Sequence, residues 1–323
     1  MNYIILLNYN NWEDTIECLE SLLKLKNIDF KIIVCDNNSL DNSLEYIKLW
    51  ADGILKVHCK TRNKDILNLI YPLEIKPIKY KIIKEKDILI EKSDKKLILI
   101  QNENNNGYSA GNNIGIKYAM NQLDCEYIWI LNNDTVVKPL SLKYLIDEMK
   151  KDPSIGICGS KTYYYYFPNR IQCEGGYFYN KWLGYGSKKK NKLSYINGSS
   201  MLVKKDFIQD VGYLSEDYFL YYEEIDWALR GKYKYRLGYS SKSIIYHKEG
   251  GSISKEKSLL SDFYSIRNRI IVTKKFYKYC LPTIYLGILI AIFNRLRRKQ
   301  FKRIWVFIKI MCLLGNYDYK KDI

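Results

Sequence analysis

The chain has 323 residues, of which 47% are hydrophobic, so it can bury a full α/β core and is not a disordered protein. Its formal net charge of +17 calls for an anionic partner or surface: nucleic acid, anionic lipid or a charged substrate. The eight cysteines form no Cys-x-x-Cys pair, which excludes the usual zinc-finger and redox motifs and indicates reduced core residues of a cytosolic protein.

The first predicted elements form a β-α-β unit. Apolar runs predict strands at Ile4–Leu7 and Lys31–Cys35, and helical periodicity predicts a helix between them from Trp12 to Lys24. Both strands end in polar residues that could bind a ligand: Asn8, Tyr9, Asn10, Asp36 and Asn38. Asp36 is well placed to accept hydrogen bonds from a nucleobase or a ribose. Ser39 and Asp41 are at least as consistent with capping the next helix.

Residues 56–96 interrupt this pattern with a sequence rich in Lys, Ile and Asn, which we interpret as an insertion holding a hairpin and a helix. The core resumes with a strand at Leu97–Ile100. The segment Asn105–Asn113 follows, and its Gly107 permits close backbone approach to a ligand. A helix predicted from Ile114 to Asn121 points its N-terminus at this segment, a favourable place for phosphate.

The next predicted strand, Tyr127–Leu131, is apolar throughout, as expected for a strand buried on both faces of a mostly parallel sheet. It stops at Asn132, Asn133 and Asp134. Ligands of open α/β sheets bind at the carboxyl ends of the strands. A carboxylate there suits Mg²⁺ or Mn²⁺ bound together with a substrate phosphate, although a simple polar turn is the alternative.

Three carboxylates open a predicted helix near residue 223. Glu223 and Glu224 have no evident partner in the sequence, and the apolar residues before them would raise a carboxyl pKa toward the range of a general base. Asp226 is expected to pair with Arg230, four residues later. His247 ends a later predicted strand and is a weaker candidate for binding a metal or a pyrophosphate.

These motifs, in this order, resemble those of family 2 glycosyltransferases, nearest to the rhamnosyltransferase-like branch. The matching segments are Leu7–Asn10, Asp36–Asp41, Asn105–Gly115, Leu131–Thr135, Tyr222–Arg230, His247 and Tyr264–Asn268. The resemblance implies a GT-A fold, a Rossmann-like α/β half joined to an acceptor half, over residues 1–270. It also implies a UDP- or dTDP-sugar donor carrying rhamnose or a similar hexose, a divalent metal, and inversion at the anomeric carbon. The acceptor would be a glycan or lipid-linked glycan in surface polysaccharide synthesis.

Roles for individual residues follow from the same resemblance. The residues expected to bind the nucleotide sugar are Asn8, Tyr9, Asn10, Asp36, Asn38, Gly107, Asn113 and Asn133. Asp134 is the expected metal ligand, with His247 as a later one, and Glu224 or else Glu223 is the expected catalytic base. Two residues depart from the family pattern: Asn132 replaces the first Asp of its Asp-x-Asp motif, and Glu224 stands where many members have Asp.

Residues 271–323 are predicted to form a helical tail. Two apolar runs, Cys280–Phe293 and Ile304–Leu314, flank the basic cluster Arg295–Arg303, and each is shorter than a membrane-spanning helix usually is. We favour a helical hairpin lying on an anionic cytoplasmic leaflet, with a helical pair closing the core or a dimer interface as alternatives. Since Met1–Leu7 lacks the basic region of a secretory signal, we expect a cytoplasmic protein on the inner face of the plasma membrane.

Three other functions compete with this interpretation. A nucleotidyltransferase would need a Gly-rich loop bearing Arg or Lys after the first strand, where this chain has Asn8–Asn11. A nucleic-acid-binding module would use the positive charge, but the basic cluster between apolar runs suits a membrane better, so nucleic acid is not an expected partner. A catalytically inactive glycan-binding relative stays open because of Asn132.

Overall fold

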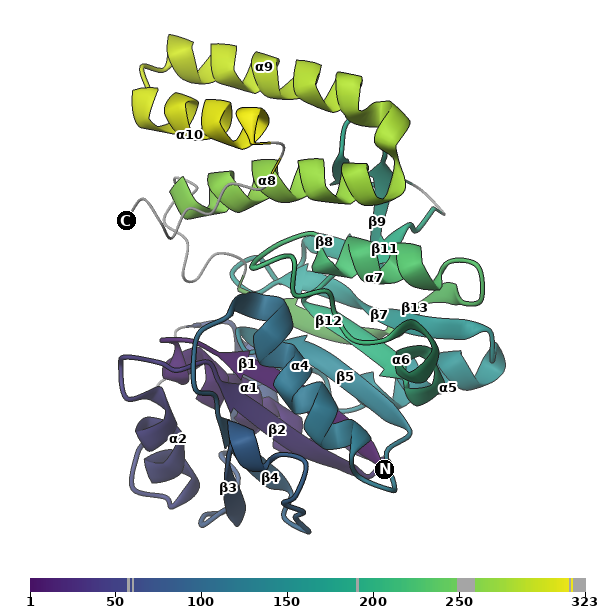
Figure 1. Ribbon diagram of the computed structural model, residues 1–323. Coiled ribbons are helices and arrows are strands. Elements are labelled where there is room, and N and C mark those ends of the chain that lie inside the picture. Colours follow the sequence, from purple (N-terminus) through teal and green to yellow (C-terminus); the bar gives the residue numbers. More distant parts are fainter. Residues whose placement is uncertain (57–58, 60, 190–191, 249–258, 314, 316–323) are drawn as a thin grey trace.

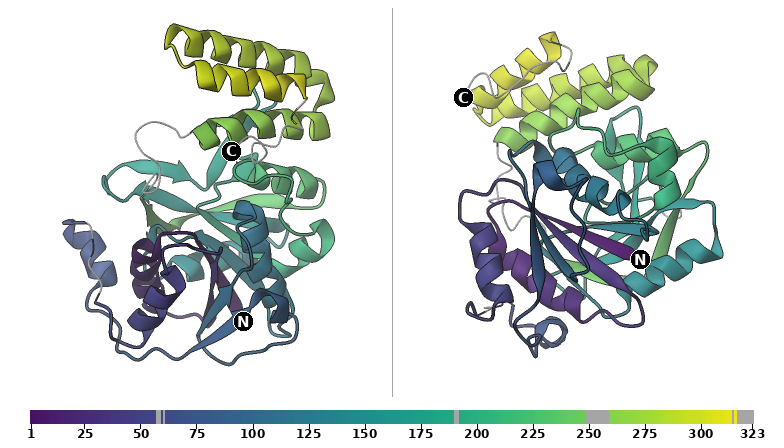
Figure 2. Two further views of the ribbon diagram at one scale, coloured as in Figure 1. Left: turned by 60° about the vertical axis from the view of Figure 1, so that its left-hand side comes forward. Right: turned by 60° about the horizontal axis from the view of Figure 1, so that its bottom comes forward.

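The computed structural model describes residues 1–56, 59, 61–189, 192–248, 259–313 and 315 (Figure 1). It is a mixed α/β protein in which helices cover both faces of one central sheet, as predicted. A group of C-terminal helices lies outside this body, beside one end of it (Figure 2). The polar residues singled out above therefore belong to the sheet and its covering helices, and the tail forms a further layer.

The sheet contains thirteen strands among the described residues. They are β1 Asn2–Asn8, β2 Phe30–Asp36, β3 Tyr80–Lys84, β4 Leu97–Gln101, β5 Tyr127–Asn132, β6 Thr135–Val137, β7 Ile155–Tyr164, β8 Ile171–Glu174, β9 Gly176–Asn180, β10 Tyr185–Ser187, β11 Tyr195–Ile196, β12 Ser200–Lys204 and β13 Arg236–His247. Their order is β10-β9-β8-β7-β12-β5-β1-β2-β4-β3, with β11 on β9, and β13 pairing both β7 and β6. The strands β5, β1, β2, β4 and β3 are parallel, so their carboxyl ends meet at one edge.

Ten α-helices complete the described fold. They are α1 Trp12–Leu23, α2 Ser43–Ala51, α3 Lys64–Ile70, α4 Gly107–Met120, α5 Ser141–Lys151, α6 Lys205–Val211, α7 Glu223–Gly231, α8 Leu259–Phe276, α9 Leu281–Arg297 and α10 Phe301–Cys312. Helices α1, α2 and α5 share a core with one face of the sheet. Helices α4, α6 and α7 share a core with the other face. Burial on both faces explains why the central strands are continuous apolar runs.

The strand register aligns the predicted site residues. Asn8 at the end of β1 lies opposite Asp36 at the end of β2, and Leu7 lies opposite Asn132 at the end of β5. On the far side, β13 pairs with β6 so that His247 lies opposite Thr135. Segments separated by more than 100 residues thus end at the same edge of the sheet.

Most of the segment Asn105–Asn113 is helical, although we expected the helix to begin only at Ile114. Helix α4 begins at Gly107, seven residues before the predicted start. A Cβ on Gly111 would lie 2.5 Å from Cδ1 of Leu7, and one on Gly115 would lie 2.9 Å from Sγ of Cys35. These two glycines let α4 pack closely on β1 and β2, so helix–strand contact and not ligand approach explains them.

The prediction that residues 56–96 form an insertion with a hairpin and a helix is also only partly correct. It contains a helix, α3, but β3 forms no hairpin: it pairs in parallel with β4, with Tyr80 opposite Leu97. Strand β3 thereby extends the central sheet as its edge strand. The second half of the segment is therefore part of the fold's core sheet, because its Ile83 side chain is buried with those of the neighbouring strands.

The C-terminal helices pack on one another and on the first domain. Helix α8 crosses the predicted domain boundary at residue 270, and α9 and α10 lie beyond it from the sheet (Figure 1). Their apolar residues form a core that also contacts Phe219, Leu220 and Tyr221. The buried Asp262 of α8 accepts a hydrogen bond from Arg295 at 2.8 Å and is paired with Arg303. The tail is thus anchored both by apolar contacts and by a buried ion pair.

Candidate active site

The ends of β1 and β2 are joined by a buried hydrogen-bond network. Asn8 donates from Nδ2 to Oδ1 of Asp36 at 2.7 Å. Ser39 donates to Asp36 from its hydroxyl at 2.6 Å and from its backbone N–H at 3.1 Å. Three donors hold this carboxylate in one orientation, at a strand end where a nucleoside could be read. Ser39 therefore orients Asp36, and it does not cap the following helix.

The turns after the two strands are tied together. Asn10 receives the N–H of Leu40 on its side-chain oxygen at 2.7 Å and donates its own N–H to the hydroxyl of Ser39 at 3.0 Å. Asn10 and Asn38 have φ of 50° and 58°, a left-handed conformation that Asn adopts more readily than most residues. Tyr9 and Asn38 are exposed. Both turns thus form a rim around Asp36.

Asn133 connects this network to the end of β5. Its Nδ2 donates to the hydroxyl of Thr15 at 2.8 Å, and that hydroxyl donates to Oδ1 of Asn8 at 2.8 Å. Asn8 therefore contacts groups on both of its neighbouring strand ends. Three predicted nucleotide residues, Asn8, Asp36 and Asn133, thus belong to a single polar network at the ends of β1, β2 and β5.

Asp134 and His247 come together although they lie far apart in the sequence. Oδ1 of Asp134 lies 3.1 Å from Nε2 of His247, and both side chains are mostly buried. Nδ1 of His247 lies 3.0 Å from Oε1 of Gln172. Burial opposes ionisation of Asp134, but the His247 imidazole and Lys248 more than offset it and lower the pKa of this carboxyl. Asp134 is consequently an anion at neutral pH.

This pair has the donor chemistry of a divalent metal site. When His247 gives up the Nε2 proton that it shares with Asp134, Nδ1 can donate to Oε1 of Gln172, and Nε2 then presents a lone pair toward the carboxylate. Two acceptors facing each other need a proton or a cation between them. Among the described residues no cluster of three or more His, Cys, Asp or Glu side chains is placed to hold a metal. Asp134 and His247 therefore fit an ion that takes its remaining ligands from phosphate and water, as Mg²⁺ and Mn²⁺ often do.

Glu223 and Glu224 open α7 in a dry environment. Each has a buried Oε2 with no hydrogen-bond partner among the described residues. Burial raises the pKa of Glu224 to about 7, and burial together with the charge of Glu224 raises the pKa of Glu223 well above its ordinary value. Such carboxylates can accept a proton at neutral pH. Asp226, by contrast, is paired with Arg230 at 2.6 Å, as predicted.

Tyr108 links the carboxylates to the end of β5. Its hydroxyl donates to the carbonyl of Gly198 at 2.9 Å and lies 3.4 Å from Oδ1 of Asn132. Burial raises the pKa of this phenol well above its ordinary value, and the negative charges of Glu223, Glu224 and Asp134 add to the effect. All three carboxylates therefore lie within electrostatic reach of one hydroxyl. The expected base and the expected metal ligand thus share one region.

Two predicted binding residues, Gly107 and Asn113, contact other parts of the protein. Gly107 has φ of 91°, and a Cβ there would lie 2.3 Å from the carbonyl oxygen of Phe219. Asn113 donates from Nδ2 to the carbonyl of Leu214 at 2.9 Å and to Glu216 at 2.8 Å. Gly107 permits α4 to approach the segment before α7, and Asn113 holds the loop after α6.

Lys248 is a site neighbour that the sequence did not reveal. It is buried and donates from Nζ to Asp14 at 2.6 Å and to Glu17 at 2.7 Å, both on α1. Its backbone N–H donates to the carbonyl of Asp134 at 3.0 Å. Lys248 thus fixes the strand end that carries His247 against α1. Its partners lie more than 230 residues earlier, so no local pattern could have indicated them.

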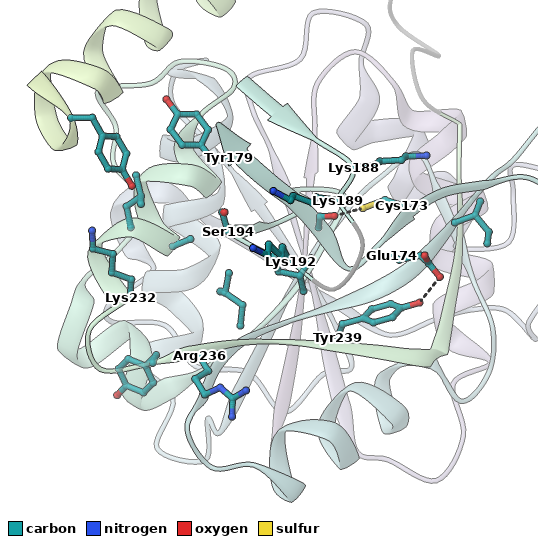
Figure 3. Close-up of a pocket in the computed structure, with 18 residues that line it drawn as sticks. Cys173, Glu174, Tyr179, Lys188, Lys189, Lys192, Ser194, Lys232, Arg236 and Tyr239 are labelled. Carbon is teal, nitrogen blue, oxygen red and sulfur yellow. Dashed lines mark hydrogen bonds between the residues drawn. The ribbon is translucent and has the colours of Figure 1, made fainter. Parts of the chain in front are cut away.

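A cavity of about 1110 Å³ lies toward the other end of α7 (Figure 3). Five of the described residues that line it are basic: Lys188, Lys189, Lys192, Lys232 and Arg236. The carboxylate of Glu174 also lines the cavity. Glu174 is hydrogen-bonded by the hydroxyl of Tyr239 at 3.4 Å. None of the predicted site residues lines this cavity. The polar network at the strand ends is therefore a separate feature.

Solved structures share this fold. The mannosyltransferase PcManGT from Pyrobaculum calidifontis, solved with GDP-Man and Mn²⁺, has a TM-score of 0.57 and 12% identity, covering 98% of this chain and 87% of that one. GalNAc-T7, solved with UDP, GalNAc and Mn²⁺, has a TM-score of 0.55 and 13% identity, covering 87% of this chain and 49% of that one. At this identity the likeness establishes the GT-A fold alone.

Sequence comparison gives the family. The low-salt glycan biosynthesis hexosyltransferase Agl10 of Haloferax volcanii is 24% identical over 195 residues, which are 55% of this chain and 60% of that protein. The chain therefore spans somewhat under two thirds of this relative's length. The model of glycosyl transferase family 2 matches residues 3–66 and 81–212. With more than half of its length matched, the chain belongs to glycosyl transferase family 2.

Proposed function

We propose that the protein transfers a hexose from a nucleoside-diphosphate sugar to a hydroxyl of a glycan or lipid-linked glycan, with inversion at the anomeric carbon. The observation that carries this proposal is the placement of Asp134, Glu223 and Glu224 within electrostatic reach of Tyr108. Each of the two Glu side chains also has a buried Oε2 with no hydrogen-bond partner among the described residues. A metal-type pair beside a buried base is what a single-displacement transfer needs. A nucleotidyltransferase has no use for that base, and a purely glycan-binding protein has no use for either group.

The donor is held at the carboxyl ends of β1, β2 and β5. Asp36 accepts hydrogen bonds from the base or ribose, since its orientation is already fixed by Asn8 and Ser39. A donor with uracil or thymine is our preferred choice, and the sugar is rhamnose or a similar hexose. PcManGT was solved with GDP-Man and GalNAc-T7 with UDP, so guanine and uracil donors both belong in a first screen.

Asp134 and His247 would hold Mg²⁺ or Mn²⁺ together with the donor diphosphate. Bound there, the ion offsets the negative charge that grows on the departing diphosphate. Both neighbours above were solved with Mn²⁺. In this chain Gln172 orients the imidazole and Lys248 holds the Asp134 strand end. The departure from the family motif at Asn132 leaves these contacts intact.

Glu224 is the proposed general base. It takes the proton of the acceptor hydroxyl as that oxygen attacks the anomeric carbon. The bond from the anomeric carbon to the diphosphate oxygen breaks, and the nucleoside diphosphate leaves with the electron pair. No covalent intermediate with the protein forms, by analogy with single-displacement glycosyl chemistry. Glu223 is the alternative base, because its side chain is buried and its carboxyl lies within electrostatic reach of that of Glu224.

The outer face of α9 and α10, which we call the tail surface, is the proposed membrane contact. Its large apolar side chains are exposed: Leu286, Leu289, Ile290, Phe293, Leu296, Phe301, Trp305 and Ile308. Arg297, Arg298, Lys299 and Lys302 are also exposed at the connection between the two helices. An apolar face beside four cations is complementary to an anionic bilayer. A lipid-linked acceptor would then be presented at the same surface.

One segment, Lys278–Arg297, has 20 residues and is long and apolar enough to cross a membrane by length and composition, which corrects the expectation that it is too short. We nevertheless propose that α9 lies in the membrane plane. Its Ile284 and Ile288 are buried against the other tail helices, and Arg295 is paired with Asp262. A spanning helix would have to give up these contacts. The cytoplasmic leaflet is the proposed location.

The proposal is tested by nucleoside-diphosphate release from UDP-glucose, UDP-GlcNAc, dTDP-rhamnose and GDP-mannose, each with Mn²⁺ and with chelator. We expect release from at least one donor, faster with a glycan acceptor and lost with chelator. Release of pyrophosphate from a nucleoside triphosphate and a sugar phosphate would instead support the nucleotidyltransferase. Binding of donor without release in any combination would support the inactive relative.

A further inference from the structure

A turn of unusual backbone conformation precedes the two carboxylates of α7. Tyr221 and Tyr222 have φ of 69° and 78°, in the left-handed region that bulky side chains rarely adopt. Two such residues in succession carry strain and persist only where their surroundings hold them. Glu223 begins α7 directly afterwards. The turn therefore sets the direction in which Glu223 and Glu224 leave the chain.

The side chain of Asn268, on α8, holds this turn. Its Nδ2 donates to the carbonyl oxygen of Leu220 at 2.8 Å and to that of Tyr221 at 2.9 Å. A side-chain amide has two N–H donors, and the two successive carbonyls use both. Asn268 is fully buried, and its oxygen accepts a hydrogen bond from Nη1 of Arg267 at 2.9 Å. The orientation of the amide is therefore fixed from both sides.

The neighbours of the turn are held independently. The hydroxyl of Tyr222 donates to the carbonyl of Gly184 at 2.6 Å, and that of Tyr221 lies 3.1 Å from the hydroxyl of Ser261. At the other end, the carbonyl of Phe219 accepts the N–H of Tyr108 at 2.8 Å. These contacts anchor the side chains and the entry of the segment, whereas Asn268 binds the backbone carbonyl of the strained Tyr221 and that of Leu220 before it.

We propose that Asn268 is a positioning residue for the transfer step, because it holds the Leu220–Tyr222 turn in the conformation that directs Glu223 and Glu224 toward Tyr108. The inference rests on the proposed function, which assigns the base to these carboxylates. Asn268 acts through the turn and contacts no reacting group. Without its two donors, the partly buried carbonyls of Leu220 and Tyr221 would lose these hydrogen bonds, and the turn would relax.

Two variants and one control test the inference. Asn268→Asp keeps the shape and removes both donors, and Asn268→Ser is a smaller polar replacement in case the first does not fold. Thr273→Val is the matched control, because Thr273 is buried in the same helix and its hydroxyl donates to the Arg269 carbonyl of that helix at 2.7 Å. Each protein is first titrated with UDP and Mn²⁺ to confirm an intact nucleotide site.

The readouts are backbone hydrogen exchange in the peptide covering residues 218–226, and the pH dependence of kcat and KM with the active donor. We expect faster exchange in both Asn268 variants, with kcat lower by about 10- to 100-fold and KM for the donor nearly unchanged. The acidic limb of the pH profile should move to lower pH, because carboxylates released from the dry site return toward ordinary ionisation. Thr273→Val should match the wild type in hydrogen exchange, in kcat and KM, and in the pH profile.

Unchanged exchange in the turn, or unchanged kcat and pH profile, overturns the inference. Loss of UDP binding in both Asn268 variants overturns it as well, since Asn268 would then be a residue of general stability. The proposed function fails separately: a wild type that turns over none of the donors contradicts that proposal, while the exchange comparison still decides whether Asn268 holds the turn.

Discussion

At the scale of single residues, the site is defined by carboxylates in different states. Asp36 is held by three hydrogen bonds, and Asp134 is ionised beside His247. Glu223 and Glu224 each have a buried oxygen, Oε2, without a hydrogen-bond partner among the described residues. In the proposed mechanism, these different environments suit the same functional group to different tasks: reading the nucleoside, holding a cation, and taking a proton. The differences among the four carboxylates follow from how deeply each one is buried and from which groups contact it.

The base assignment predicts the behaviour of Glu224→Gln. The amide keeps the shape of the side chain and cannot take a proton, so transfer should fall by about 100-fold or more while the affinity for UDP and Mn²⁺ is retained. Steady-state rates and calorimetric titration measure the two quantities. Glu223→Gln, in the same experiment, should lose less activity. A Glu224→Gln enzyme with normal turnover would show that the base lies elsewhere.

The raised pKa values also predict a cost in stability at high pH. A carboxyl whose folded-state pKa is raised favours the folded state below its ordinary pKa, and this advantage is lost as pH rises through the folded value. For Glu224 that window runs from its ordinary value of 4.5 to about 7. Replacing Glu224 by Gln should therefore raise the free energy of unfolding by about 1–3 kcal/mol at pH 8, and change it little at pH 4.

The exposed Glu103 supplies the matched control for that measurement. Glu103→Gln should leave the thermal melting temperature almost unchanged at both pH values, because an exposed carboxylate carries no penalty of burial. Equal effects of Glu103→Gln and Glu224→Gln would indicate a general charge effect on this basic protein. Destabilisation by Glu224→Gln at pH 8 would contradict a carboxyl whose buried Oε2 has no hydrogen-bond partner among the described residues.

At the scale of helices and strands, continuous apolar runs were the reliable signal. They predicted β1, β2, β4 and β5 to within two residues at each end, because strands buried on both faces need such runs. Because parallel strands end at the same edge of a sheet, the polar residues that follow these strands could also be predicted to lie at that edge. The β4–α4 connection was misread, since glycine-rich sequence indicates a loop locally, and only contact with Leu7 and Cys35 explains a helix there.

Contacts distant in sequence set the limit of prediction at this scale. Lys248 with Asp14, and Asn268 with Leu220, join segments that no periodicity relates. The motif Tyr264–Asn268 was noticed only through the family resemblance, without a role. Its role depends on the left-handed turn at Tyr221 and Tyr222, and nothing in those two residue types indicates such a conformation.

The contact between α4 and the turn before α7 predicts a severe effect of Gly107→Ala. A Cβ there would meet the Phe219 carbonyl at 2.3 Å, and φ of 91° is strained for alanine. We expect a loss of about 2–4 kcal/mol in the free energy of unfolding, together with lost transfer, measured by chemical denaturation and donor turnover. Gly287→Ala in α9 is the control: nothing lies within 4 Å of its Cβ, so it should stabilise by about 0.5–1 kcal/mol.

A Gly107→Ala protein of normal stability and rate would show that α4 and the segment before α7 do not touch as described. Severe destabilisation by Gly287→Ala would likewise contradict the open surroundings of α9. The pair of variants thus tests one close contact and one exposed face with the same chemical change.

At the scale of the whole molecule, the tail surface is large, apolar and basic, and α8 connects it to the turn before the two carboxylates that we propose for catalysis. The same helix carries Asp262, which anchors Arg295 and Arg303, and Asn268, which binds the turn before Glu223. The positive charge of the chain is thus partly concentrated where an anionic membrane would lie. Monomeric proteins rarely expose so many large apolar side chains on one face.

The membrane proposal predicts binding to vesicles of phosphatidylcholine with phosphatidylglycerol, measured by co-sedimentation, and weaker binding to phosphatidylcholine alone or at high salt. Leu289→Ser with Phe293→Ser should weaken binding by about 10-fold or more, because each inserted side chain contributes about 1.5–3 kcal/mol. Arg297→Gln with Arg298→Gln should weaken it similarly, at about 1 kcal/mol per charge. Leu123→Ser, an exposed leucine between α4 and β5, should have no effect.

Absence of vesicle binding would contradict the membrane proposal. If the wild type instead forms a dimer in solution that Leu289→Ser with Phe293→Ser dissociates, the tail surface is an interface between two copies of the chain. Sedimentation velocity at several protein concentrations distinguishes these outcomes.

The most direct test of the central claim is a thermal-shift titration of the wild type and Asp134→Asn with UDP, dTDP and GDP, each with and without Mn²⁺. A ligand that binds only the folded state stabilises it, by about 2.7 kcal/mol at 100 times its dissociation constant. We predict a metal-dependent rise in melting temperature with UDP or dTDP that Asp134→Asn abolishes. No rise with any nucleotide, or an equal rise in both proteins, would contradict a nucleotide-sugar site built around Asp134.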